Sequence, residues 1–469
     1  MGNSVMLNFA VQLILRLRNR FRTSQIVRYY RKQENGKIVS RFNLSDIRHV
    51  ATCRPELYPL IFQACAEYNL KHLQAKKRIK VAFILYSASM WSCDELYRLF
   101  QEDPRFEPYI ILSRYTLDAN QTTFPTFQKS LQAFKNTNYH IVILDQNLPK
   151  QKCYAAMGEP DIVFFLTPYN VLVPIGQNEC YLPASVLCIY IPYAYMLIKA
   201  DEKFNSDGMT LSWRHFTDSV LYRQMLIQYS DNYRLNTFFV GYPKMDVYYQ
   251  PPQKSKTEIW KFPHGSTAKC IIYAPHHSLR GAKKCTAHFS TFDDNFRAVL
   301  EYARSHQTET SWIIKPHPNL KMTVLETGLF HSEEEYNAYL AEWNNLPNAK
   351  VVEEATYYDI FKTSDAMICD SVSFLAEYQF TGKPLLLLTR PEQEFNEFGR
   401  KLAEVLYQVP GNDLNGIKDF IDAVVLEGKD GMKKRRDDFF RLNLDYRFNS
   451  QPPASQQIYN HIVSAIGSV

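Results

Sequence analysis

The chain has 469 residues, of which 46% are hydrophobic and 22% are charged, and this balance excludes a disordered protein. A chain of this length is too long to fold around a single hydrophobic core of ordinary size, so two domains with a cleft between them are predicted. Lys and Arg outnumber Asp and Glu by 54 to 48, and much of this excess lies in the first 32 residues. Because the positive charge gathers at one end instead of lining a face, nucleic-acid binding is not expected.

The nine cysteines are scattered and form no C-x-x-C pair. This pattern indicates neither a disulfide framework nor a four-cysteine zinc site. A reducing, cytoplasmic location therefore fits the sequence best.

Residues 1–50 form a basic N-terminal segment, in which apolar residues alternate with Arg16, Arg18, Arg20 and Arg22. Such a segment is typical of an amphipathic helix that lies on an anionic membrane surface. Its apolar stretch is too short and too broken to span a bilayer, and no cleavage site follows it. We therefore expect a peripheral position on the inner face of the cell membrane; a surface helix docked on the protein body is the alternative.

An N-terminal domain is predicted over residues 76–250 from apolar runs that alternate with segments long enough for crossovers. Such alternation predicts a parallel sheet flanked by helices. The expected strands are "IKVAFILY" (79–86), "EPYIILS" (107–113), "YHIVILD" (139–145), "DIVFFLT" (161–167) and "VLCIYIP" (186–192).

A second domain is predicted over residues 259–450, after the polar, Pro-containing linker at 248–258, and a closing helix over 451–469. The expected strands are "KCIIYAP" (269–275), "SWIIK" (311–315), "AKVVE" (349–353), "DAMICD" (365–370) and "PLLLLT" (384–389). The fold class is therefore α/β, with two doubly wound, Rossmann-like domains that face a cleft. Ligands bind such sheets beyond the carboxyl ends of the strands.

Unusual polar groups follow four strands of the second series at those carboxyl ends. In chain order they are His276, His277 and Arg280; Lys315 and His317; Ser371, Ser373 and Glu377; and Thr389 and Arg390. Pro316 and Pro318 restrict the backbone on both sides of His317.

A strand-to-helix junction with two hydroxyls suits phosphate oxygens, because backbone N–H groups are unpaired there. Lys315, Arg280 and Arg390 could balance the charge of a phosphate, and His317 could donate a hydrogen bond to it. Glu377 lies one turn into the helix, where a carboxylate can accept hydrogen bonds from ribose hydroxyls. Together these groups predict a site for a nucleoside diphosphate, although each one taken alone could be a cap or a solvated residue.

Other sites are less well supported. His276, His277, Cys285 and His288 lie close together in sequence, but their spacing matches no zinc pattern, and no metal site is expected. The chain has no G-x-x-x-x-G-K-[ST], no G-x-G-x-x-G and no G-x-S-x-G, so a P-loop, a dinucleotide fingerprint and a serine-hydrolase elbow are not indicated.

Four segments of the chain resemble the CDP-glycerol glycerophosphotransferase family, whose members build poly(glycerol phosphate) and related teichoic or capsular polymers. The segments are "VGYPKMD" (240–246), "IIYAPHHS" (271–278), "IIKPHP" (313–318) and "YYDIFKTSDAMICDSVSFLAEYQFTGKPLLLL" (357–388). The resemblance covers the chain from Val240 to its end and implies a GT-B architecture whose second domain holds the nucleotide.

By position, His317 matches the family's His-Pro histidine, which contacts the donor diphosphate, and Ser371 and Ser373 fall in the segment that binds donor phosphates. The correspondence of Glu377 to the ribose-binding position of this fold is looser. The family usually carries a His-Gly-Thr-Pro segment in the N-terminal domain, and its histidine is the proposed base. The corresponding region here, "VLCIYIPYAYML" (186–197), has Tyr193 and Tyr195 but no histidine.

The candidates for the base are then His276, His277 and Asp94, with Trp91, Tyr193 and Tyr195 on the acceptor side. The reaction implied is transfer of glycerol phosphate, or of another polyol phosphate, from a CDP-activated donor to a hydroxyl of a glycan or lipid-linked acceptor, with release of CMP. No tightly bound cofactor is expected. The alternatives are a GT-B glycosyltransferase that uses a nucleotide sugar and an inactive scaffold of a polymer-assembly complex.

Overall fold

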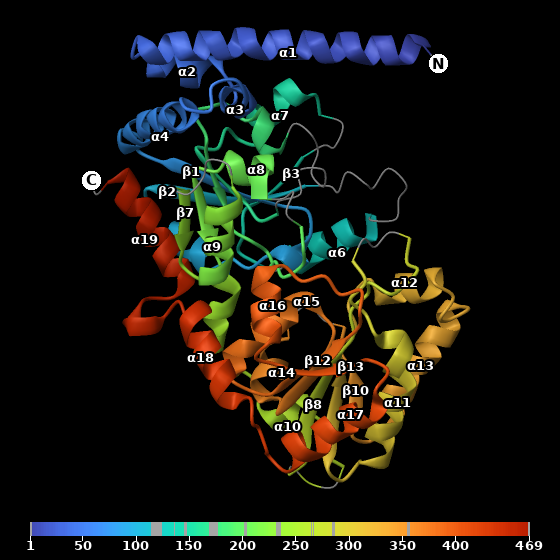
Figure 1. The fold of residues 1–469 in the computed structure, drawn as a ribbon. Helices are drawn as coiled ribbons and strands as arrows, with labels where there is room; N and C mark the ends of the chain where they lie inside the picture. Colours follow the sequence, from blue (N-terminus) through green and yellow to red (C-terminus); the bar gives the residue numbers. More distant parts are fainter. Residues whose placement is uncertain are drawn as a thin grey trace.

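A computed structural model describes residues 2–113, 124–135, 137–144, 148–167, 177–200, 204–230, 236–263, 265, 267–283, 287–353 and 357–467. Two parallel sheets, each flanked by helices, form the two halves of the molecule (Figure 1). The α/β fold class and the two Rossmann-like domains predicted from the sequence are thus confirmed.

The first sheet has seven strands in the order β3-β2-β1-β4-β5-β6-β7, and all neighbouring strands are parallel. The central strands are continuous apolar runs because helices cover both of their faces. The strands are β1 (Ile79–Leu85), β2 (Phe106–Leu112), β3 (Ile141–Ile143), β4 (Ile162–Phe165), β5 (Leu187–Tyr190), β6 (Arg214–Thr217) and β7 (Thr237–Phe239). The sequence did not predict the last two, which lack a continuous apolar run.

Helices and short helical turns connect these strands. They are η1 (Ala88–Met90), α5 (Asp94–Glu102), α6 (Phe124–Phe134), α7 (Lys150–Ala156), η5 (Glu179–Tyr181), α8 (Asp207–Thr210), α9 (Val220–Tyr229) and η8 (Pro243–Tyr249). The chain crosses into the second domain along η8.

The second sheet has six parallel strands in the order β10-β9-β8-β11-β12-β13. The strands are β8 (Lys269–Ala274), β9 (Thr310–Ile314), β10 (Ala349–Val351), β11 (Ala366–Cys369), β12 (Leu385–Thr389) and β13 (Tyr407–Pro410). The strand order reverses between β8 and β11, and this switch point is where open α/β sheets bind ligands.

The helices of this half are α10 (Lys256–Ile259), α11 (Phe292–Ser305), α12 (Leu320–Glu326), α13 (Glu333–Asn345), α14 (Tyr358–Thr363), α15 (Val372–Glu377), η9 (Tyr378–Thr381), α16 (Glu397–Ala403), α17 (Leu414–Asp419), the π-helical η10 (Phe420–Leu426) and α18 (Lys433–Asn443). The turn η11 (Phe448–Ser450) and α19 (Ala454–Ile466) end the described chain.

Helix α19 packs on the first domain, although it follows the second in sequence (Figure 1). Its buried Ile458, Ile462 and Ile466 belong to the same apolar cluster as the residues of β1 and α5. Asp246 of η8 accepts hydrogen bonds from Ala454 N (2.7 Å) and Ser455 N (3.0 Å) at the start of α19. The two segments that cross between the domains are therefore joined at this carboxylate.

The N-terminal residues form α1 (Gly2–Arg31), α2 (Asn35–Arg41), α3 (Leu44–Cys53) and α4 (Tyr58–Gln74). Helix α1 lies across the end of the molecule farthest from the second domain (Figure 1). Its C-terminal half packs on α2, α3 and α4 through Ile26 and Val27, whereas apolar residues between Val11 and Phe21 remain exposed. In the described part of the chain, no helix has the length and apolar character needed to cross a membrane.

Candidate active site

A cleft of about 530 Å³ separates the two domains at the carboxyl ends of their strands. Of the residues singled out in the sequence, eight line it: Trp91, Asp94 and Tyr193 from the first domain, and Lys315, His317, Ser371, Ser373 and Glu377 from the second. The strands that deliver the second-domain residues, β9 and β11, both adjoin β8 at the switch point. The cleft therefore brings most of the expected site together.

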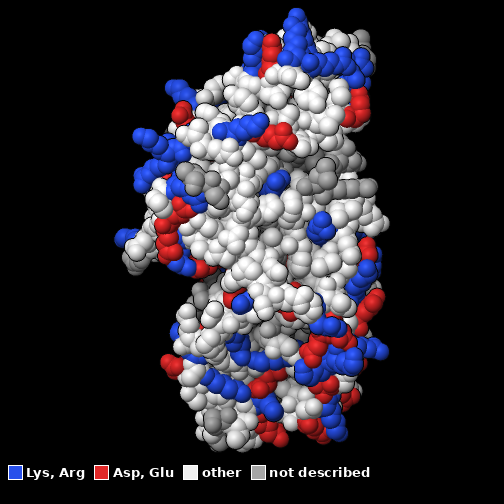
Figure 2. Space-filling view, turned by 90° about the vertical axis from the view of Figure 1, so that its left-hand side faces the viewer, with Lys and Arg blue, Asp and Glu red and all other residues white. Residues whose placement is uncertain are grey.

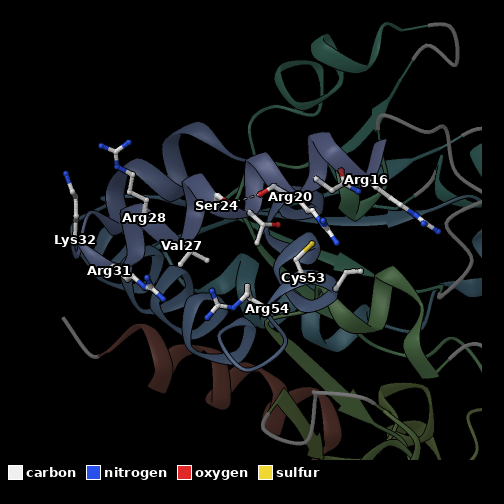
Figure 3. A pocket seen from close by; sticks show the side chains of 12 residues that line it. Arg16, Arg20, Ser24, Val27, Arg28, Arg31, Lys32, Cys53 and Arg54 are labelled. Carbon is white, nitrogen blue, oxygen red and sulfur yellow. Dashed lines mark hydrogen bonds between the residues drawn. The ribbon is translucent and has the colours of Figure 1, made fainter. Parts of the chain in front are cut away.

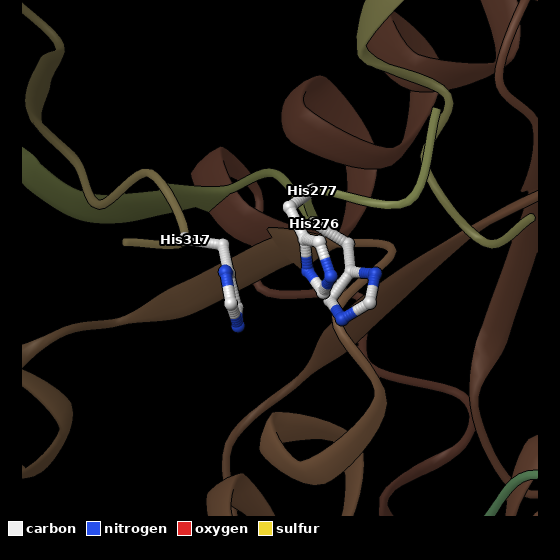
Figure 4. Close-up of side chains that lie close together, drawn as sticks. All are labelled: His276, His277 and His317. Carbon is white, nitrogen blue, oxygen red and sulfur yellow. The ribbon is translucent and has the colours of Figure 1, made fainter. Parts of the chain in front are cut away.

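His317 lies in this cleft and packs against two more imidazoles, those of His276 and His277 (Figure 4). The ring centroid of His317 is 4.1 Å from that of His277, with the rings stacked, and 5.1 Å from that of His276. His276 and His277 follow β8 and are not among the described residues that line the cleft. They contact His317 from within the second domain, and that either one is the base stays a prediction.

All three imidazoles are neutral near pH 7. Burial lowers the pKa of His317 to about 3 and that of His277 to about 4, and it places the pKa of His276 well below its usual value. Electrostatic interaction with His277 and with the Lys315 ammonium lowers the pKa of His317 further.

The hydrogen bonds of two of these rings fix their tautomers. Asn319 N donates to His317 Nδ1 (3.1 Å), and Ser278 N donates to His276 Nδ1 (3.3 Å). Because Nδ1 is the acceptor in each neutral ring, the proton resides on Nε2. His317 Nε2 is therefore a hydrogen-bond donor, which suits a phosphate oxygen.

The same tautomers disfavour a metal ion, although the ligand nitrogens of His276, His277 and His317 lie within 4.8 Å of one another. A metal ligand must present a deprotonated nitrogen, and Nε2 of two of the rings carries a proton. Of the other residues considered from the sequence as metal ligands, Cys285 lies outside the described residues, and His288 Nδ1 is 3.3 Å from Leu279 O.

The junction between β11 and α15 lines the cleft from the second domain. Asp370 is buried; it accepts hydrogen bonds from His276 N (2.6 Å) and from Thr291 Oγ1 (2.9 Å). Burial raises the pKa of Asp370 to about 6. Ser371 is the N-cap residue of α15, but its side chain makes no capping hydrogen bond, and together with Ser373 it lines the cleft. The hydroxyl of Ser371 is thus not used to cap the helix.

Glu377, at the end of α15, is held by two residues that the sequence did not single out. Tyr357 Oη donates to Glu377 Oε2 (2.5 Å), and Lys244 Nζ lies 3.4 Å from the same oxygen. Lys315 Nζ lies 5.2 Å from the centroid of the Tyr357 ring. Lys244 belongs to the "VGYPKMD" segment. The family resemblance included this segment but predicted no role for the lysine.

On the first-domain wall, Asp94 begins α5 and accepts a hydrogen bond from Trp91 Nε1 (2.9 Å). The hydroxyl of Tyr139 also donates to Asp94, and burial raises the pKa of that tyrosine. Tyr139 precedes β3 and was read from the sequence only as part of a strand. Its contact with Asp94 and Trp91 depends on tertiary packing of the segment before β3 against the residues that follow β1.

Four expected site residues lie elsewhere, which corrects the prediction. Tyr195 is buried at the domain interface, with its ring 5.5 Å from Tyr242 and 6.2 Å from Phe398. Arg280 is exposed and pairs with Glu392 (2.9 Å).

Thr389 ends β12 and Arg390 follows it; β12 is one strand farther from β8 than β11 is. The buried Arg390 donates to Ser290 O and has Asp293 (3.4 Å), Asp294 (3.8 Å) and Glu392 (3.6 Å) as ionic partners. Its charge is neutralised within the second domain, and neither residue lines the cleft. The carboxyl edge of the second sheet is longer than the cleft, whose described lining does not include the end of β12.

A second hollow, of about 1050 Å³, lies beside α1 (Figure 3). Six cationic residues line it: Arg16, Arg20, Arg28, Arg31, Lys32 and Arg54. No acidic residue is among the described residues that line it. Figure 2 shows Lys and Arg side chains gathered at the same end of the molecule.

Solved structures with the same architecture include the wall teichoic acid polymerase TagF, at 12% identity over 96% of this chain and 98% of that chain, with a TM-score of 0.55. A TagF variant soaked with CDPG matches over the same shares at 12% identity and a TM-score of 0.53. A UDP-GlcNAc 2-epimerase from Neisseria meningitidis bound to UDP-GlcNAc has 14% identity over 82% of this chain and 100% of that chain, with a TM-score of 0.53. At these identities the likeness establishes the fold alone.

The comparison with curated protein sequences gives no match. The family described as CDP-glycerol:poly(glycerophosphate) glycerophosphotransferase matches residues 210–464, which is more than half of the chain and includes His317, the β11–α15 junction and Lys244. The protein is a transferase that belongs to this CDP-glycerol glycerophosphotransferase family.

Proposed function

We propose that the protein transfers glycerol phosphate from CDP-glycerol to a hydroxyl of a glycan or lipid-linked acceptor and releases CMP during synthesis of a cell-surface polymer. The observation that carries this proposal is the position of His317 Nε2–H, Lys315 and the hydroxyls of Ser371 and Ser373 around one cleft at the switch point of the second sheet. His317 and the two serines supply hydrogen-bond donors and Lys315 supplies a positive charge, and a diphosphate needs both.

In this reaction the acceptor oxygen forms a bond to the phosphorus that carries glycerol. The bond between that phosphorus and the bridging oxygen breaks, and CMP leaves with the electron pair. The protein contributes mainly position and charge, because phosphoryl transfer needs little covalent help. His317 is suited to this task because its ring is held by His277 and by Asn319 N before the donor arrives, which avoids reorganisation.

Glu377 would accept hydrogen bonds from the ribose hydroxyls. Tyr357 and Lys244 hold its carboxylate in place from one side. Because Lys244 lies in η8, where the chain crosses between the domains, this contact would also link the nucleotide to the crossing segment.

Calorimetric titration with CDP-glycerol, CDP-ribitol and UDP-glucose tests the proposal. We expect CDP-glycerol to bind the wild type and His331→Ala, a control at an exposed histidine, with equal affinity. His317→Ala should keep the fold, weaken donor binding at least tenfold and reduce CMP release by at least ~100-fold, the range of a lost transition-state donor.

Three outcomes would contradict the proposal. Near-normal turnover by His317→Ala would remove that residue from the site. Preference for UDP-glucose would indicate a glycosyltransferase. Binding of CDP-glycerol without CMP release for any acceptor would indicate an inactive scaffold.

We also propose that α1 places the protein on an anionic membrane surface. Ile14, Leu17 and Phe21 are 63%, 57% and 65% exposed, and the cationic hollow lies beside them. Exposed apolar residues and arginines are intermixed around α1 and do not form two separate faces, unlike the amphipathic pattern predicted from the sequence. The support is therefore the attraction of the arginines to anionic headgroups, together with the exposed apolar side chains beside them. This position would be peripheral, on the cytoplasmic face where nucleotide donors are found.

Binding to vesicles of phosphatidylglycerol tests this position. The triple variant Ile14→Gln, Leu17→Gln and Phe21→Gln should lose vesicle binding and keep its affinity for CDP-glycerol. Leu442→Gln is the matched control, because Leu442 is 63% exposed on the other domain. Equal vesicle binding by the triple variant and the control would refute the proposal.

A further inference from the structure

The two walls of the cleft differ in charge. The second domain and η8 contribute Lys315 and Lys244 together with the acidic residues Glu353 and Glu377. On the first-domain wall, Asp94 is the one charged residue among the described residues that line it. The part of a ligand that contacts this wall therefore lies near one negative charge, and the described residues of the wall supply no positive charge to balance it.

Aromatic rings dominate the first-domain wall. Trp91, Phe134 and Tyr139 pack edge to face around one another, with ring centroids 5.3 to 6.2 Å apart. Tyr193 lies beside them in the lining, and its backbone carbonyl accepts a hydrogen bond from the buried Tyr242. Such rings combine a large apolar face with rigid placement.

Asp94 is placed among these rings with one oxygen available. Both of its hydrogen bonds, from Trp91 Nε1 and from Tyr139 Oη, end on Oδ1. No hydrogen bond to Oδ2 occurs within the described parts of the chain, and the residue is exposed to the cleft. The carboxylate is thus oriented by one oxygen and can accept a hydrogen bond from a ligand hydroxyl with the other.

We propose that the first-domain wall, formed by Trp91, Asp94, Phe134, Tyr139 and Tyr193, binds an uncharged sugar ring, so that the acceptor is a neutral glycan. The C–H face of a pyranose can lie on the aromatic rings while its hydroxyl bonds to Asp94 Oδ2. A chain that ends in glycerol phosphate would instead bring its own negative charge beside Asp94, without a lysine or arginine from the described wall, and like charges repel. This inference rests on the proposed function, since the donor half of the cleft is taken to hold CDP-glycerol.

The geometry also assigns Asp94 the role of base. The sugar hydroxyl passes its proton to Asp94 Oδ2 as its oxygen forms the new bond to phosphorus, and the bond to the CMP oxygen breaks. The segment that corresponds to the family's first-domain His-Gly-Thr-Pro has no histidine here, and Asp94 lines the wall that the inference gives to the acceptor. Contribution of a general base is typically about 100-fold or more in rate.

Acceptor binding can be measured without the donor by saturation-transfer NMR on the full-length protein. The probes are methyl β-glycosides of neutral hexoses and N-acetylhexosamines, and a synthetic trimer of glycerol phosphate. We expect saturation to reach ring protons of at least one glycoside and to be at least tenfold weaker for the trimer. Trp91→Leu should weaken binding of the glycoside about tenfold in this measurement, whereas Tyr229→Leu, at an aromatic residue of the same domain that is 43% exposed, should not change it.

Release of CMP from CDP-glycerol gives the second readout. A neutral glycoside should be the better acceptor; Trp91→Leu should raise its KM about tenfold with little change in kcat. Asp94→Asn should lower kcat by about 100-fold, with unchanged affinity for CDP-glycerol.

Equal or better binding and turnover of the glycerol phosphate trimer would overturn the inference, and so would failure of every neutral glycoside to bind. If CDP-glycerol itself fails to bind, the proposed function is wrong, but the NMR result still decides which acceptor class the wall takes.

Discussion

The tripeptide Asp-Ser-Val occurs twice at the end of a parallel strand, with different results. Asp218, Ser219 and Val220 follow β6 of the first domain, and Asp370, Ser371 and Val372 follow β11 of the second. Both aspartates are buried. Asp370 accepts hydrogen bonds from His276 and Thr291, whereas neither carboxylate oxygen of Asp218 has a hydrogen-bond partner among the described residues.

The serines differ as well. Ser219 accepts a hydrogen bond from Tyr222 N (3.1 Å) and caps α9. Ser371 occupies the same position before α15, but it makes no such bond and lines the cleft. The tripeptide therefore predicts a strand-to-helix junction in both places. The serine hydroxyl that accepts a backbone hydrogen bond is a structural cap, whereas the one that faces the cleft is free to bind a ligand.

The largest expected effect concerns Asp218. Burial raises its pKa from 3.8 to about 7, so the unfolded chain ionises at lower pH than the folded protein. The contribution of Asp218 to the free energy of unfolding therefore falls as pH rises from about 4 to about 7. The fall is up to ~4 kcal/mol, at about 1.36 kcal/mol per pKa unit. Asp218→Asn should raise the free energy of unfolding at pH 8 by as much as this and leave it unchanged at pH 4, as urea titrations would show. A lower free energy of unfolding for Asp218→Asn than for the wild type at pH 8 would contradict this difference between the two aspartates.

Asp370→Asn should have the opposite sign. The side-chain amide nitrogen of this variant would face either Thr291 N or His276 N, both of which now donate hydrogen bonds to the carboxylate. An unsatisfied buried donor costs about 1–3 kcal/mol, so we expect a loss of ~3 kcal/mol in the same titrations. Weaker binding of CDP-glycerol should accompany it, because His276 packs against His317. Unchanged stability would show that the hydrogen bonds of Asp370 are not needed.

The smallest effects should come from the serines and should fall on different observables. Ser219→Ala removes a cap and should cost about 1 kcal/mol of stability with no change in donor affinity. Ser371→Ala should change stability little and weaken CDP-glycerol binding about tenfold, the loss of one hydrogen bond to a charged group. Calorimetry and urea titration on both variants provide the measurement. Equal stability losses would mean that Ser371 is also only a cap.

Much of the fold could be predicted because the central strands are fully buried and read as continuous apolar runs. Strands β6, β7 and β13 were not predicted because none of them reads as a long apolar run: β6 (RHFT) and β13 (YQVP) contain polar residues or proline, and β7 (TFF) contains only two apolar residues. Strand β13 is also half-exposed at the edge of the sheet. The C-terminal helix could be expected, but its place on the first domain could not, because that contact depends on tertiary packing.

For the site, the polar residues after β9 and β11 could be predicted, because neighbouring parallel strands end at one edge. Arg390 could not be excluded, since its acidic partners Asp293 and Asp294 come from α11, far away in sequence. Tyr139 and Lys244 were missed for a related reason: each contacts a site carboxylate from a segment with no chemical signal of its own.

The return of α19 to the first domain has a consequence for the order of folding. All strands of the second sheet lie between Lys269 and Pro410, so that sheet can form while the last helix is still being synthesised. The core of the first domain is completed only when Ile458, Ile462 and Ile466 arrive to cover it. Domains usually fold in the order in which they are synthesised, but here the first domain to begin is the last to be finished, and loss of the final helix would leave its apolar surface open.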